Sequence, residues 1–259
     1  MNQFSVRLLC IWCPLIALGC FETVESTAKV DHETLAVLKN FDYRDLTQTL
    51  AAYVDPQRGV DYEALKGNRE RLDRFVATLA IVGPQTRPEL FSQREEQLAY
   101  YINAYNALTL FNVINRMPEF KRVDDDLKSF FYFTRFHLDG AKRSLYQLEN
   151  DIIRPRFKEP RIHFALNCAS MGCPTLPSAP FLPQTLERQL TEETSHFLNR
   201  RLNVQIHDST VTLSKIFKWY ADDFDPDPVT WIGAHAPHLK FPEDPTVRYR
   251  DYDWTLNGQ

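Results

Sequence analysis

One segment, residues 97–116, constrains the fold more than any other, because apolar side chains occur on nearly every side of its helical projection. Ser92-Gln-Arg-Glu95 directly before it has the form of a capping box, with Ser92 as the N-cap. A helix that is apolar all round must be enclosed by other elements. The sequence therefore predicts a buried central helix here. Its apolar positions are Leu98, Tyr101, Ile102, Tyr105, Leu108, Leu110, Phe111, Val113 and Ile114.

Two amides, Asn103 and Asn106, interrupt this apolar helix. Their spacing of three places them on one face. Because buried amides need hydrogen-bond partners, they either bind the backbone of a neighbouring loop or face a functional site. The residues alone leave both interpretations open.

The remaining periodicities predict helices and short strands in mixture. Asp139-Gly140 has the signature of a hairpin turn, and Asp208-Ser209 is the centre of a second plausible hairpin. The pattern predicts an α+β fold in which a helix-rich N-terminal half packs on a small antiparallel sheet. Helices are expected over residues 41–54, 65–82, 144–153, 185–199 and 214–224, and strands over 132–138, 143–145, 203–207, 210–213 and 247–254.

Length and charge limit the class of protein. The chain has 259 residues and a net charge of -4, which offers no electrostatic case for nucleic acid as a partner. Its length suits one sizeable domain or two small ones. We expect that domain over residues 41–224, with a C-terminal extension, residues 225–259, packed on it.

The N-terminal residues have the layout of a signal peptide, predicted over residues 1–19. An apolar run ends at Gly19-Cys20, and the sequence before Cys20 resembles a bacterial lipobox, although Ala17 stands where such boxes usually carry Leu. The prediction is a protein exported to the periplasm or cell envelope. There it would be anchored in the membrane as a lipoprotein through Cys20, with residues 20–40 as a tether. An ordinary signal peptide cleaved nearby is the alternative.

The stretch from Ile162 to Pro174 concentrates the candidate chemistry. It begins as an apolar run of strand character and then turns at Gly172 and Pro174. It holds a histidine, His163, and the only two cysteines that follow Cys20. A reactive group at the end of a strand is exposed on a rigid support. The stretch therefore suggests an active site.

Cys168 is the first candidate nucleophile, since a thiolate beside a base attacks carbonyl groups. His163 is the closest imidazole in sequence. Side chains alternate along a strand, so the two meet only if the chain bends before Cys168. Glu149 lies in the preceding helix and is a candidate to orient the histidine. Cys173 is an equal candidate for the thiol that reaches His163.

Three other interpretations of the cysteines stay open. The first is that Cys168 is plain core packing. The second is a disulfide between Cys168 and Cys173 in an oxidising compartment, since a turn can bring their Cα atoms within the ~4.4–6.8 Å that a disulfide requires. A metal site with His163 is disfavoured, because the spacing matches no common zinc pattern and a fourth ligand is not evident. No metal and no cofactor are predicted.

Several segments together resemble a family known as domain of unknown function 547 (DUF547), in its bacterial exported form. They follow the family order from about residue 50 to residue 224. They are Tyr53-Val-Asp, Gly59-Val-Asp-Tyr62, Tyr101-Ile-Asn-Ala-Tyr-Asn-Ala-Leu108, Ser144-Leu-Tyr-Gln-Leu-Glu149, Arg161-Ile-His-Phe-Ala-Leu-Asn-Cys-Ala-Ser-Met-Gly-Cys-Pro174 and Leu213-Ser-Lys-Ile-Phe-Lys-Trp-Tyr-Ala-Asp-Asp-Phe224.

The resemblance implies a papain-like cysteine hydrolase architecture. On that basis Cys168 is the nucleophile, His163 the general base and Glu149 the orienting residue. Asn103 and Asn106 fall on the family's asparagine positions, where they would support the site or the oxyanion. Ser170 and Cys173, in the same stretch as Cys168, are further candidates for site support. Relatives often carry histidine where this chain has Asn150, and this departure puts the identity of the base in doubt. Plant relatives commonly lack the second cysteine, which argues against an obligatory disulfide.

Two functional hypotheses follow. The first is a lipid-anchored cysteine hydrolase that acts on amide bonds of a small peptide or thiol peptide. The second is a non-catalytic periplasmic lipoprotein that binds a partner or small ligand, with Cys168 and Cys173 structural.

Overall fold

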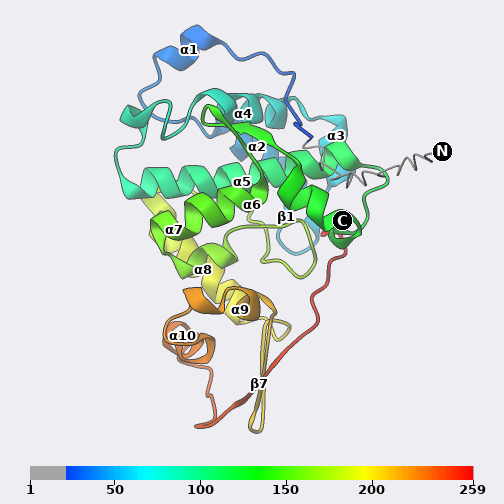
Figure 1. Cartoon of the computed structure of the whole chain (residues 1–259), viewed down its shortest axis with the longest axis vertical. Coiled ribbons are helices and arrows are strands. Elements are labelled where there is room, and N and C mark those ends of the chain that lie inside the picture. The colour runs from blue at the N-terminus through cyan, green and yellow to red at the C-terminus, as the bar shows by residue number, and fades with distance from the viewer. Residues whose placement is uncertain (1–21, 259) are drawn as a thin grey trace, which may run out of the picture.

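A computed structural model describes residues 22–258 and shows an α+β fold built around one long helix, α5 (Arg94–Arg116) (Figure 1). Every side chain of α5 from Leu98 to Ile114 is buried, which confirms the predicted central helix. Its cap lies one residue later than expected. The carboxylate of Glu96 accepts a hydrogen bond from the backbone N–H of Gln93 at 2.8 Å, whereas Ser92 makes only a longer side-chain bond to Glu96.

Short helices from the first part of the chain enclose α5 on one side. They are α2 (Arg44–Tyr53), α3 (Tyr62–Gly67) and α4 (Glu70–Ile81), with a two-stranded ribbon of β1 (Val54–Asp55) and β2 (Gly59–Val60) between α2 and α3. The expected single helix over residues 65–82 is thus two helices. The break occurs at Asn68, which has φ -136° and ψ 50° and ends α3.

Residues 22–36, part of the predicted tether, lie against this helical layer. The backbone N–H of Val24 donates to the carbonyl of Arg135, and the hydroxyl of Ser26 donates to the carbonyl of Asp73. A short helix, α1 (His32–Ala36), follows. The predicted signal peptide and Cys20 lie outside the described residues. Among residues 22–258, no helix has both the length and the apolar character needed to cross a bilayer.

The middle of the chain forms a hairpin and a composite helix. Strands β3 (Phe136–Leu138) and β4 (Ala141–Arg143) pair across the predicted Asp139-Gly140 turn. The helix begins at the Ser144 cap as α6 (Leu145–Gln147), widens into a π-helical turn, η4 (Leu148–Ile153), and continues as α7 (Arg154–Phe157). The helix expected over residues 144–153 therefore runs further than predicted, through Pro155 to Phe157.

The predicted strand before Cys168 is wrong. Residues Pro160–Phe164 form a 3₁₀ helix, η5, which starts with a proline and is capped by the carboxylate of Glu159 accepting from the backbone N–H of Arg161. Apolar residues in the run are buried because η5 packs on helix α8 (Leu186–Leu198). The alternation of side chains along a strand therefore does not determine how His163 and Cys168 are oriented.

The second half of the chain builds a smaller lobe with its own core. Strands β5 (Val204–His207) and β6 (Thr210–Leu213) form the predicted hairpin. Strand β7 (Thr246–Tyr249) joins β6 in parallel, so the expectation of a purely antiparallel sheet is wrong. The helix expected over residues 214–224 is only α9 (Ile216–Trp219) followed by a 3₁₀ turn, η7 (Ala221–Asp223), and α10 (Pro228–His235) comes next.

The smaller lobe has a core that is separate from the core around α5. Its buried cluster contains Phe164, Phe197, Phe217, Phe224 and Trp231, whereas α5 belongs to the larger cluster. The β strands form three small sheets rather than one that supports the helical half. After β7 the chain runs back from the smaller lobe to the helical lobe, as the red segment of Figure 1 shows. Residues 250–258 therefore connect the two lobes.

Candidate functional site

A cavity of about 520 Å³ opens between the two lobes. The composite helix contributes Glu149 and Arg154, η5 contributes His163, and the loop that follows contributes Cys168 and Cys173. Most of the remaining wall is aromatic. Its rings are Tyr105, Phe131, Tyr132, Tyr146, Trp219, Tyr220, Tyr252 and Trp254.

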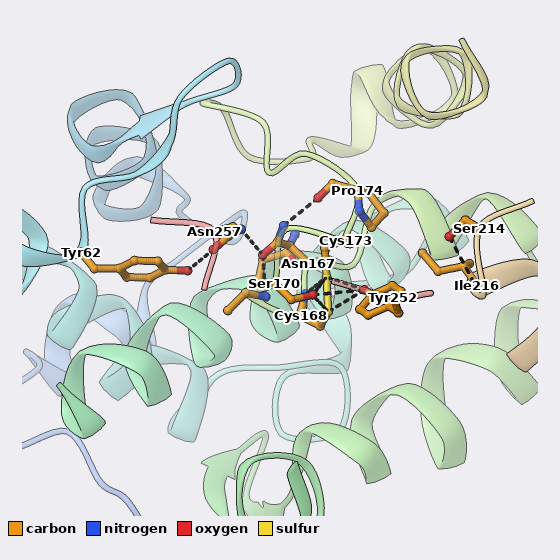
Figure 2. The surroundings of a disulfide bond; sticks show 12 residues. Tyr62, Asn167, Cys168, Ser170, Cys173, Pro174, Ser214, Ile216, Tyr252 and Asn257 are labelled. Atoms are coloured by element: carbon orange, nitrogen blue, oxygen red, sulfur yellow. Dashed lines mark hydrogen bonds between the residues drawn. A yellow bond between two sulfur atoms is a disulfide. The ribbon is translucent and has the colours of Figure 1, made fainter. Parts of the chain in front are cut away.

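Cys168 and Cys173 are joined by a disulfide bond (Figure 2). The sequence left this pairing open as one of several outcomes. The hydroxyls of Ser170 and Tyr252 each lie 3.2 Å from the Sγ atom of Cys168. Because both cysteines are oxidised, neither offers a thiol in this state, and the bridge forms part of the cavity wall.

The loop that carries the disulfide, residues 165–174, is held from the helical lobe by Asn106. Its amide donates to the carbonyl of Ala165 at 2.9 Å, and its oxygen accepts from the backbone N–H of Asn167 at 2.8 Å. Asn103 makes the equivalent pair of bonds to the backbone of Phe181, away from the loop. Both amides thus bind loop backbone, but only Asn106 positions the candidate site.

Residues 250–258 hold the same loop from its other side. Backbone N–H groups of Met171 and Gly172 donate to carbonyls of Thr255 and Asp253, each at 2.8 Å. Figure 2 shows how Asn257 extends the contact. It accepts from the hydroxyl of Tyr62 at 2.7 Å, and its amide donates to Asn167 at 3.2 Å. Residues 250–258 also place the rings of Tyr252 and Trp254 in the cavity wall.

His163 is 4% exposed and is fixed on two sides. Its Nε2 lies 2.7 Å from Oδ2 of Asp223 in η7, and its ring stacks on Tyr220 with a centroid distance of 3.9 Å. The carboxylate that orients this histidine is therefore Asp223, whereas the sequence suggested Glu149.

Asp223 also receives two hydrogen bonds from Arg154, at 2.7 and 3.1 Å. Partial burial on its own raises the pKa of the Asp223 carboxyl. The hydrogen bonds and charges of His163 and Arg154 outweigh burial and hold that pKa far below its usual range. The guanidinium of Arg154 reaches Asn150 as well, with Nη1 donating to its side-chain oxygen at 2.7 Å. Asn150 thus helps to fix Arg154.

Glu149 is 7% exposed and points its carboxylate at two phenols. Burial raises the pKa of the hydroxyls of Tyr105 and Tyr220 well above the usual value, and the negative charge and hydrogen bonding of Glu149 raise it further. Both phenols therefore stay protonated beside Glu149. Among residues 22–258, no ion pair joins Glu149 to a cation.

The structure thus brings Glu149, His163 and Cys168 to one cavity but links each to an unpredicted partner. The partners missed from sequence are Asp223, Tyr220 and Tyr252. Asp223 and Tyr220 lie in the segment Leu213–Phe224 that carried the family resemblance, which was the only available signal. Within the described part of the chain, no group of three or more His, Cys, Asp or Glu side chains is arranged to hold a metal ion.

Comparison with known proteins identifies one family. The family described as "Protein of unknown function, DUF547" matches residues 89–198, a stretch that includes α5, the composite helix, η5 and the disulfide loop. The resemblance predicted from the sequence motifs is confirmed over this range. Neither the curated proteins nor the solved structures gave a match.

Proposed function

We propose that this chain, whose residues 89–198 match the DUF547 family, binds a small organic ligand in the cavity between its lobes. The observation that carries the proposal is the lining of the cavity, which consists of aromatic rings around one buried carboxylate. Small-molecule sites are typically concave and mostly apolar, with a few fixed polar groups. The cavity volume of about 520 Å³ lies within the usual range of roughly 300–1,000 Å³ for such sites.

The disulfide supports binding rather than nucleophilic catalysis. A bridged Cys168 has no thiolate, so it cannot attack a carbonyl group. The predicted export of the protein would keep the bridge oxidised. Under this proposal the cysteines are structural, and export through the signal peptide and anchoring at Cys20 remain predictions from the sequence.

A second candidate function is a cysteine hydrolase of papain-like type, formed on reduction of the bridge. One observation favours it, since Glu149, His163 and Cys168 line a single cavity although they are distant in sequence. A dithiol reductant would supply two electrons and leave two thiols. The Cys168 thiolate would then bond to the carbonyl carbon of a small peptide or thiol peptide. The amine would leave with a proton from His163, and water would hydrolyse the thioester.

A cavity-filling substitution tests the binding function. Leu127 is half-buried and lines the cavity, so Leu127→Trp should fill it without disturbing the core. Leu202→Trp is the matched control, because Leu202 is exposed and lies off the cavity. Ligand-observed NMR with a panel of amines, sugars, dipeptides and thiol peptides would report binding. We expect compounds that bind the wild type and Leu202→Trp but not Leu127→Trp. If the compounds that bind the wild type also bind Leu127→Trp, the cavity is not the ligand site. If no compound in the panel binds, the proposal is refuted as well.

The same panel tests the second function. Peptide hydrolysis would be followed by mass spectrometry with and without dithiothreitol. Turnover that begins on reduction, disappears in Cys168→Ser and survives in Cys173→Ser would establish the hydrolase. Ligand binding without turnover in either redox state would exclude it.

A further inference from the structure

We infer that the ligand of this cavity carries an alkylammonium group, held beside Glu149 and against the surrounding aromatic rings. This inference rests on the proposed binding function and names the chemical class of the ligand. Three features of the cavity support it, which are its charge, its rings and the placement of Glu149 among them.

Glu149 is the one carboxylate that the described residues contribute to the lining. Arg154, the one lysine or arginine among those lining residues, and His163 both bind the carboxylate of Asp223, so Asp223 rather than Glu149 is their hydrogen-bond partner. The remaining described hydrogen bond of Arg154 goes to Asn150. Glu149 has phenols beside it, and among residues 22–258 it forms no direct ion pair, although Arg154 lies close enough to interact with its charge. A buried carboxylate without a direct ion pair attracts a cationic ligand, because its charge is poorly screened by water.

The rings form two groups that expose their surfaces. Tyr132 and Tyr146 stack at 4.4 Å, and they are 41% and 39% exposed. On the smaller-lobe side, Trp219 lies 4.8 Å from Tyr252 and 5.6 Å from Trp254. Trp219 is 45% exposed. The faces of Trp and Tyr rings carry partial negative charge and bind ammonium groups, quaternary ones in particular.

The position of Glu149 distinguishes a cation from other ligands of aromatic sites. Sugars and apolar molecules also stack on tryptophan and tyrosine, but they gain little from a buried negative charge. Here the carboxylate belongs to the cavity lining itself, together with the rings of Tyr105 and Tyr220 that approach it. An ammonium group in this position would lie beside the carboxylate and within the aromatic lining of the cavity.

Choline and its neutral isostere 3,3-dimethylbutan-1-ol provide a direct test, because they differ essentially in charge. Titrations of purified full-length protein would be followed by NMR and calorimetry. We expect the dissociation constant for choline to be at least about tenfold lower than that for the isostere. Glu149→Gln keeps the size of the side chain but removes its charge. It should raise the dissociation constant for choline about tenfold or more and leave that for the isostere unchanged. Glu192→Gln, an exposed carboxylate outside the lining, is the matched control and should change neither constant.

Trp219→Leu gives an independent readout in case Glu149→Gln impairs folding, because Trp219 is half-exposed. This substitution should raise the dissociation constant for choline by about 2- to 30-fold. Equal binding of choline and the isostere, unaffected by Glu149→Gln, would overturn the cation inference but leave the ligand site intact. Failure of both probes to bind would also overturn the inference. In that case the Leu127→Trp screen decides whether the proposed function survives.

Discussion

The carboxylate oxygen Oδ2 of Asp223 lies 2.7 Å from Nε2 of His163 and 2.7 Å from Nε of Arg154. One oxygen thus joins an imidazole in η5 and a guanidinium in α7 to the smaller lobe. Because Tyr220 stacks on the same imidazole, the ring of His163 has little freedom to rotate. Asp223 is therefore the residue that fixes two cavity-lining side chains at once.

Asp223→Asn should destabilise the protein in a pH-dependent manner. The folded-state pKa of Asp223 is depressed, so its stabilising contribution is present above the ordinary aspartate pKa and is lost as the pH falls below about 4. The carboxylate is partly exposed, and solvent screening limits the effect near neutral pH to about 1 kcal/mol, or about 2–4 °C in Tm. Thermal unfolding from pH 7 to pH 2 should show the wild type and the variant converging. A gap that widens toward acid would contradict the assignment.

The disulfide should stabilise the fold modestly, because it closes a short loop. Cys168 and Cys173 are five residues apart, and closing a loop of this length contributes about 2 kcal/mol. The double substitution Cys168→Ser with Cys173→Ser should lower the free energy of unfolding in urea by that amount. Dithiothreitol should lower the stability of the wild type equally and leave the double variant unchanged. Two free thiols in the unreduced mature protein would show that the bridge does not form.

Asn106→Ala and Asn103→Ala form a matched pair on one face of α5. Each substitution leaves a buried N–H and a buried carbonyl of a loop without a partner, which costs about 2–4 kcal/mol of unfolding free energy. Of these two asparagines, only Asn106 binds the backbone of the loop that contains the disulfide. We therefore expect similar losses in urea unfolding but weaker ligand binding in Asn106→Ala alone. Equal loss of binding in both variants would mean that the loop does not depend on Asn106 specifically.

Gly172→Ala should disturb the cavity wall through a steric contact. A Cβ atom at Gly172 would lie 2.9 Å from the ring of Tyr252, which is closer than real contacts allow. The ring must then move away from Ser170 and Trp254, at a cost of about 1–3 kcal/mol. Gly67→Ala is the control, because nothing lies within 4 Å of the added atom. Near-ultraviolet circular dichroism should change for Gly172→Ala only, and an unchanged spectrum would show that Tyr252 tolerates the methyl group.

Features set by local chemistry were predictable from the sequence. The apolar surround of α5 required a central helix, and the Asp139-Gly140 pair required a tight hairpin. Both residues of that turn have positive φ, at 52° and 76°, the conformation that aspartate and glycine accept most readily. Asn103 and Asn106 were expected either to bind the backbone of a neighbouring loop or to face a functional site. Both bind loop backbone.

Features set by contacts between distant segments were not predictable. The apolar run at residues 162–167 is buried by α8, and neither its length nor its composition separates a strand from a short helix. The Glu159-Pro160 pair that caps η5 was the local signal that the strand interpretation overlooked. The pairing of Asp223 with His163 spans 60 residues, and no periodicity reports a contact of that kind.

The hydrogen bond from Tyr62 to Asn257 joins residues that are 195 positions apart. Closing a loop of that length carries a large entropic cost before any contact compensates for it, so such contacts form late in folding. During synthesis, α5 and its neighbouring helices emerge well before residues 250–258. Until residues 250–258 make their contacts, the disulfide loop therefore lacks its backbone bonds to Asp253 and Thr255. We expect oxidation of the two cysteines to be easiest before these contacts form.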